Sequence, residues 1–157
     1  MSQSRVSHAN STLLPPSRSF AYALRLMLTG LALATGLIAL WLGSVVIAVL
    51  PSRDPQHVGM WTAIAGACLA YAALSLACVA RGARPAWLPA ALAVGSLAAL
   101  AFGGYAITSM VRAADDSSRF EGYLLVMGVV LAAHGACALA YSALVISTPR
   151  RLAGPRL

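Results

Sequence analysis

The chain has 157 residues, of which 60% are hydrophobic and only 10% are charged. So few polar side chains cannot cover the core of a soluble domain of this length, and the composition excludes an ordinary soluble globular protein. The formal net charge of +7 would suggest nucleic-acid binding in a soluble protein, but arginines beside anionic headgroups gain about 1 kcal/mol each. We therefore expect this basic charge to face the lipid bilayer, and we expect no nucleic-acid partner.

Residues 1–20 are expected to form a disordered tail in the cytoplasm. They are rich in serine, contain Pro15 and Pro16 and carry no acidic residue, a composition that does not support a packed structure. A mitochondrial transit peptide has a similar composition, so the mitochondrial inner membrane is an alternative location. All 11 basic residues are arginine, which together with the abundant alanine indicates a GC-rich genome and favours a bacterial inner membrane.

Four apolar stretches follow within residues 21–148, the predicted membrane domain. Each runs for more than 20 residues without Asp, Glu, Lys or Arg, and about 20 such residues cross a hydrocarbon core about 30 Å thick as a helix. The predicted spans are 26–50, 60–80, 87–111 and 123–146. Transmembrane strands would need about 10 residues of alternating polarity, which these stretches lack. We therefore predict an all-α integral membrane protein, an up-down four-helix transmembrane bundle with short loops, followed by a second cytoplasmic tail at 149–157.

The charged residues predict the orientation of the bundle. All acidic residues lie in the polar stretches after the first and third spans: Asp54, Asp115, Asp116 and Glu121. The two terminal stretches and the stretch between the second and third spans contain arginine and no acid. Because loops with an excess of Lys and Arg stay on the cytoplasmic side, both termini are predicted to be cytoplasmic.

Small residues recur along each span at steps of three and four, which places them on one side of a helix. Such a stripe lets transmembrane helices pack closely. An alanine-rich chain produces such stripes by chance, so the glycines carry the prediction, because each interior glycine lowers helix propensity by about 1 kcal/mol in water. The predicted helix-packing glycines are Gly36, Gly43, Gly95, Gly103, Gly128 and Gly135.

One histidine, His134, lies near the middle of the fourth span, where an ionisable side chain suggests a functional site. Steps of three and four place Met127, His134, Cys137 and Tyr141 on one stripe that is expected to face the bundle. Met, His and Cys suit a soft metal such as copper, and a histidine can relay protons. A neutral histidine that hydrogen-bonds to a neighbouring helix is the favoured interpretation.

No motif in the chain predicts catalysis. The three cysteines, Cys68, Cys78 and Cys137, lie inside spans, which argues against disulfide chemistry. A single intramembrane histidine does not provide the two axial ligands of a haem held between helices. No nucleophile elbow, H-E-x-x-H pair or phosphate-binding loop occurs. We therefore assign no catalytic, cofactor-binding or metal site.

The expected role is non-enzymatic: an accessory, assembly or interaction protein that is a homo-oligomer or part of a larger membrane complex. The first alternative is an oligomeric small transporter or channel subunit. Small multidrug transporters have a similar size and four spans, but the membrane-embedded glutamate of their first span is missing here. The second alternative is a metal- or redox-linked membrane protein that uses the stripe of His134.

Overall fold

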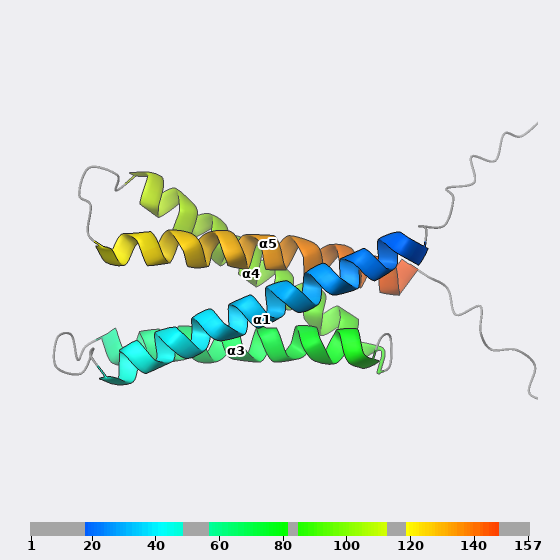
Figure 1. The fold of residues 1–157 in the computed structure, drawn as a ribbon, viewed down its shortest axis with the longest axis horizontal. Coiled ribbons are helices and arrows are strands. Elements are labelled where there is room, and N and C mark those ends of the chain that lie inside the picture. Colours follow the sequence, from blue (N-terminus) through cyan, green and yellow to red (C-terminus); the bar gives the residue numbers. More distant parts are fainter. Residues whose placement is uncertain (1–17, 49–56, 82–84, 113–118, 148–157) are drawn as a thin grey trace, which may run out of the picture.

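The computed structural model describes residues 18–48, 57–81, 85–112 and 119–147. They form four helices: α1 (Arg18–Ala48), α3 (Val58–Arg81), α4 (Trp87–Arg112) and α5 (Arg119–Ser147) (Figure 1). All four are long and apolar enough to span a membrane, and the described ranges contain no strand. The fold is therefore the predicted all-α four-helix transmembrane bundle.

The helices extend beyond the predicted spans. α1 begins at Arg18, so residues 18–20 of the predicted tail are helical, and α5 begins at Arg119, before the predicted span. Charged residues delimit the part of a helix that lies in hydrocarbon, but the helix itself continues into the interface, where long basic side chains reach water and headgroups. The remaining parts of the predicted tails, and Asp54, Asp115 and Asp116, lie outside the described residues.

Two prolines shape the start of α4. The Leu88 amide donates a hydrogen bond to the Pro85 carbonyl oxygen at 3.0 Å, which forms the turn that enters the helix. Pro89 lies in the first turn of α4, where its missing amide hydrogen leaves no helical hydrogen bond unmade. Residues 82–86 separate α3 from α4, and α4 returns antiparallel to α3 (Figure 1).

The helices pack unequally against one another. α4 and α5 form the most extensive contact, α1 packs mainly against α3, and α1 also packs against α5. α3 and α4 contact each other least among these pairs, although they follow each other in the chain. The bundle thus consists of two antiparallel hairpins, α1–α3 and α4–α5, that meet mainly where α1 crosses α5 (Figure 1).

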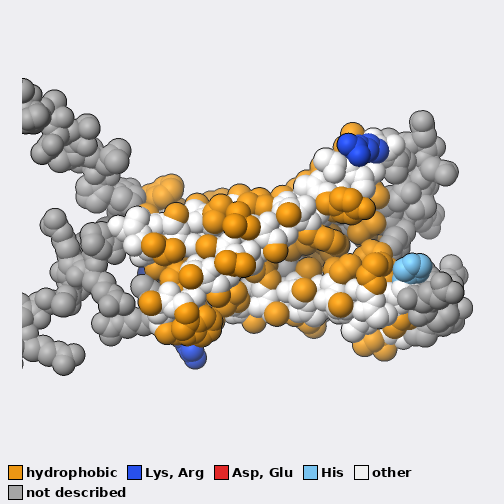
Figure 2. Space-filling view, turned by 180° about the vertical axis from the view of Figure 1, so that it is seen from behind, with side chains coloured by type: hydrophobic (Ala, Val, Ile, Leu, Met, Phe, Trp, Pro, Cys, Tyr) orange, Lys and Arg blue, Asp and Glu red, His pale blue; other side chains and the backbone are white. Residues whose placement is uncertain are grey.

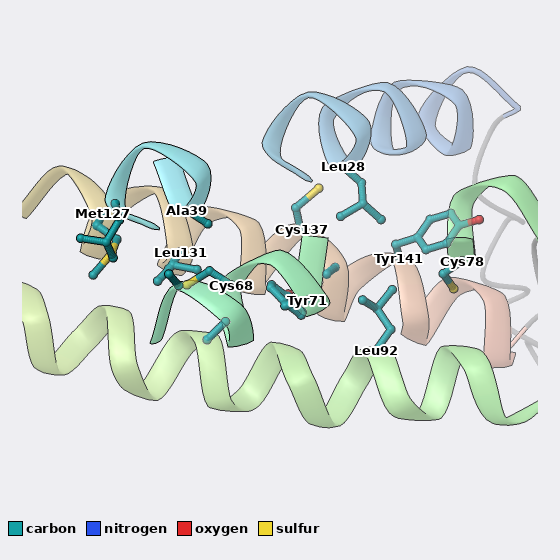
Figure 3. Packing of buried hydrophobic residues seen from close by; sticks show 14 of the residues in the cluster. Leu28, Ala39, Cys68, Tyr71, Cys78, Leu92, Met127, Leu131, Cys137 and Tyr141 are labelled. Carbon is teal, nitrogen blue, oxygen red and sulfur yellow. The ribbon is translucent and has the colours of Figure 1, made fainter. Parts of the chain in front are cut away.

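Buried side chains from all four helices form the core between the hairpins (Figure 3). On α1 they follow steps of three and four along one side of the helix: Leu24, Leu28, Ala32, Thr35, Ala39, Leu42 and Val46. Leu33, Leu37 and Leu40 face outward. The flank in Figure 2 is apolar along its length and carries basic side chains only towards its ends. Such a surface suits contact with lipid chains rather than water.

Three glycines bring α4 and α5 into backbone contact. A Cβ atom added at Gly103 would lie 2.7 Å from the Gly128 carbonyl oxygen and 2.9 Å from the Ala132 nitrogen. A Cβ atom added at Gly135 would lie 2.9 Å from the Ser96 carbonyl oxygen. No side chain fits at such distances, so the two helices approach as closely as their backbones allow.

The other three predicted packing glycines differ in their surroundings. A Cβ atom at Gly36 would make an ordinary contact with Ala72 at 3.8 Å, and one at Gly95 would lie 3.1 Å from the Tyr71 ring. At Gly43 it would have no atom within 4 Å, so this glycine does not pack against a described helix, contrary to expectation. Gly36 and Gly43 lie at the edge of the buried side of α1, directly after the buried residues Thr35 and Leu42.

Candidate functional site: a hydrogen-bonded network around His134

His134 lies on α5 inside the bundle and is 0% exposed. Its Nδ1 atom is 2.8 Å from the Thr35 hydroxyl oxygen on α1. Its Nε2 atom is 2.9 Å from the Ser75 hydroxyl oxygen on α3. The imidazole therefore joins the α4–α5 hairpin to both helices of the α1–α3 hairpin.

A second hydrogen bond of Ser75 identifies the tautomer of His134. The Ser75 hydroxyl donates to the Tyr71 backbone carbonyl at 2.9 Å. Because a hydroxyl has a single hydrogen, Ser75 then accepts a hydrogen bond from Nε2–H of His134. The predicted spans contain no acid that could pair with an imidazolium, so the ring is neutral. In a neutral ring with Nε2–H, Nδ1 is an acceptor, and the Thr35 hydroxyl donates to it. Both ring nitrogens are then satisfied.

Tyr71 extends the network to α4. Its ring lies against the His134 imidazole, with ring centroids 4.4 Å apart and planes inclined by 39°. Its hydroxyl is 3.1 Å from the Ser96 hydroxyl oxygen, and Ser96 donates to the Leu92 carbonyl at 2.6 Å. By the same count of hydrogens, Tyr71 donates to Ser96. We call this set the His134 network: Thr35, Tyr71, Ser75, Ser96 and His134, from all four helices.

The geometry of the His134 network suits a structural role. Interhelical hydrogen bonds in membranes contribute about 0.6 kcal/mol each on average, and an unpaired polar group in hydrocarbon is costly. A charged imidazolium at this depth would need an anionic partner, and none of the predicted spans contains an acid. A metal ion at Nδ1 would have to displace the Thr35 hydroxyl, and the described residues include no group of three His, Cys, Asp or Glu that could hold it.

The other residues of the predicted stripe are buried but do not join the His134 network. The Cys137 thiol lies 3.9 Å from the Leu24 carbonyl oxygen on α1, a weak interaction. Met127 packs among core side chains beside Leu131 (Figure 3), about two helical turns before His134 on α5. The Tyr141 hydroxyl has no hydrogen-bond partner in the described part of the chain. The stripe is thus a shared side of α5 rather than one site.

The partners of His134 were not predicted from the sequence. Thr35 and Ser96 lie three residues before the middle of their predicted spans, and Ser75 lies five residues after the middle of its span. Spans that cross the same bilayer place their middles at a similar depth, so grouping polar residues by depth would have brought these hydroxyls together with His134. Helical periodicity, which considers one helix at a time, does not reveal such a group.

A groove between α3 and α4 adjoins the network through Tyr71. Its volume is about 350 Å³. The lining of this α3–α4 groove includes Ile64, Cys68 and Tyr71 on α3 and Gly95, Ala98 and Phe102 on α4. A much smaller cavity of about 30 Å³ lies beside Trp41, Trp61 and Tyr123. Both cavities have apolar linings, so neither adds a catalytic group.

The fold and the site define a class: small polytopic α-helical membrane proteins with a neutral polar network in the bundle interior. In comparisons with known proteins, no protein-family model, curated protein or solved structure matches the chain. The specific function is therefore inferred from the geometry.

Proposed function

We propose that this protein is a non-enzymatic accessory, assembly or interaction protein of a bacterial inner membrane. The hydrogen bonding of the His134 ring supports this proposal. Both of its ring nitrogens bond to hydroxyl groups of other helices, so the one histidine within the spans serves to hold the helices together. The outward apolar sides of the helices then remain for contact with lipid, with a second copy or with other membrane proteins.

The proposed orientation puts both termini in the cytoplasm. The distribution of arginine supports it, because the two terminal stretches and the α3–α4 connection contain arginine without acidic residues. In this orientation α3 begins and α4 ends at the periplasmic face.

A small transporter or channel subunit is the first alternative, and a metal- or redox-linked protein is the second. Transport of a polar solute or ion needs polar groups along a path or an exchangeable charge. The α3–α4 groove and the cavity beside Trp41 have apolar linings, and both ring nitrogens of His134 are hydrogen-bonded. No observation on the described residues favours either alternative over the proposal.

Extraction of the tagged protein in polymer-bounded native nanodiscs tests the proposed role. The mass of the extracted particle, corrected for lipid, is compared with the 16.1 kDa of one chain. We expect an assembly heavier than one chain, with a fixed ratio of its components across preparations. The His134→Gln variant keeps a hydrogen-bonding side chain and should give the same assembly. A single chain in every preparation would contradict the proposal.

Two further measurements on the same material address the alternatives. Metal content is measured on the purified protein, and solute or proton flux is measured after reconstitution in liposomes. Stoichiometric copper that disappears in folded His134→Gln protein would establish a metal-linked function instead. Flux that disappears in the same variant would establish transport. Met127→Leu is the matched control, because it removes a soft ligand of the same stripe without touching the His134 network.

A further inference from the structure

The α3–α4 groove exists because α3 and α4 pack least against each other among the main helix pairs. The two helices touch where a Cβ atom at Gly95 would lie 3.1 Å from the Tyr71 ring. The side chains of Ile64 and Phe102 also line the groove, and Leu131 of α5 forms part of its lining. The groove is thus bounded by three helices in the part of the bundle that crosses the membrane.

The lining of the groove selects a hydrocarbon. The Tyr71 hydroxyl is already bonded to Ser96, and the other lining residues contribute carbon atoms and the Cys68 thiol. The one lining hydroxyl has therefore already donated its hydrogen, and it can offer a ligand no more than an acceptor oxygen. A polar or charged ligand would lose its hydration without compensation there, whereas an apolar chain would lose nothing.

The volume of the groove excludes a whole helix as its occupant. A helix with side chains is about 10–12 Å across, so a space of about 350 Å³ holds less than one helical turn of about 5.4 Å. A methylene group fills about the volume of one water molecule, about 30 Å³, so the same space holds roughly a dozen chain carbons. A single flexible hydrocarbon chain therefore fits, and a transmembrane segment of a partner does not.

The charge at the end of α4 indicates what the chain is attached to. Arg112 is exposed and is the last residue of α4. It follows Phe102 by ten residues, which corresponds to about 15 Å along a helix, about half the thickness of the hydrocarbon core. A phospholipid with its phosphate beside Arg112 would therefore bring the lower part of an acyl chain to the depth of the groove. Arginine is the side chain best suited to pair with a phosphate.

We propose that the α3–α4 groove holds one acyl chain of a glycerophospholipid whose phosphate pairs with Arg112. The chain fills the space between α3 and α4, and the headgroup lies at the end of the bundle where α4 ends. The site takes its lipid from the leaflet at that end. This proposal does not depend on the proposed function, because a lipid can occupy the groove of a scaffold, a transporter or an enzyme.

Native mass spectrometry of protein released from micelles containing phosphatidylethanolamine and phosphatidylglycerol tests the proposal. We expect one phospholipid retained per chain. Ala98→Phe, which fills the groove, should reduce retention about tenfold or more. The matched control is Ala101→Phe, an exposed alanine of the same helix that does not line the groove, and it should retain the lipid. Equal retention by Ala98→Phe and the control would overturn the proposal.

The headgroup is tested separately with Arg112→Gln. The retention of phospholipid by this variant should fall several-fold. Its retention of diacylglycerol, which has the same acyl chains and no phosphate, should not change. Equal binding of both lipids to the unaltered protein would overturn the assignment of a phosphate. A dimer that disappears in Ala98→Phe would identify a second copy as the occupant and would also overturn the proposal.

A measurement without substitutions guards against variants that fold poorly. A phospholipid with a photoreactive diazirine near the end of one acyl chain is incorporated into nanodiscs with the unaltered protein. Crosslinks should concentrate on Cys68 and Phe102 in preference to Leu33 and Leu37, which are exposed on α1. Equal labelling of both pairs would show that the acyl chain contacts the protein surface at no specific site, and it would overturn the proposal.

Discussion

Replacing Gly103 by alanine is expected to separate α4 from α5. The new methyl group would lie 2.7 Å from the Gly128 carbonyl oxygen and 2.9 Å from the Ala132 nitrogen. Both are backbone atoms inside a helix, which cannot rotate away as a side chain can. Ordinary contact distances are about 3.5 Å or more, so the helices must move apart by roughly 1 Å before the methyl group fits.

Two effects with opposite signs determine the change in the free energy of unfolding. Alanine is a better helix former than glycine by about 1 kcal/mol. Forcing a methyl group into a filled contact costs about 1–3 kcal/mol, and here it disturbs the most extensive helix pair of the bundle. The net effect is a loss, and we expect Gly103→Ala to lower the free energy of unfolding by up to about 2 kcal/mol.

Gly43→Ala is the matched control, because a Cβ atom there has no atom within 4 Å. Only the gain in helix propensity remains, so this variant should be unchanged or more stable by up to about 1 kcal/mol. Both variants are titrated with SDS from mild detergent micelles, and the loss of helix is followed by circular dichroism. A shift of the same size and sign in both variants would refute the backbone contact between α4 and α5.

Other expected outcomes concern the network and the orientation. His134→Gln should accumulate at the normal level, whereas His134→Leu loses two interhelical bonds and should unfold more easily by about 1.2 kcal/mol in the same SDS titration; equal stability of the Leu variant would contradict the network. Tyr71→Phe should cost only about 0.6 kcal/mol, because Ser96 keeps its bond to the Leu92 carbonyl, and a loss several times larger would show that the hydroxyl does more than bridge two helices. A reporter active only in the periplasm should work when fused after residue 55 or 117 and should fail after residue 83 or at Leu157. Activity of the carboxy-terminal fusion would contradict the four-span topology.

The fold class was predictable because hydrophobic length alone defines a transmembrane helix. The four apolar stretches correspond to α1, α3, α4 and α5. The helix ends were less predictable, because Arg25 and Glu121 limit the apolar stretches, whereas the helices themselves begin earlier, at Arg18 and Arg119. The sequence contains no comparable signal for the interfacial part of a helix.

The candidate site was only partly predictable. A central position in a span singled out His134, and the structure adds Thr35 and Ser75 as partners at 2.8 Å and 2.9 Å. These partners lie on other helices, so their identity depends on how each helix is rotated about its axis. The same rotation explains Gly43, since spacing defines a stripe on α1 but not whether that stripe faces the bundle.

The division into two hairpins has a consequence for biogenesis. The α1–α3 hairpin is synthesised first and can leave the translocon with Ser75 already bonded to a carbonyl of its own helix. The α4–α5 hairpin inserts later with its glycine contact formed, but its histidine has no partner until the hairpins dock. The imidazole fits between Thr35 and Ser75 at a single depth and rotation of α5 relative to the α1–α3 hairpin. In this final step of assembly the histidine therefore selects one register, and it does so with little effect on total stability.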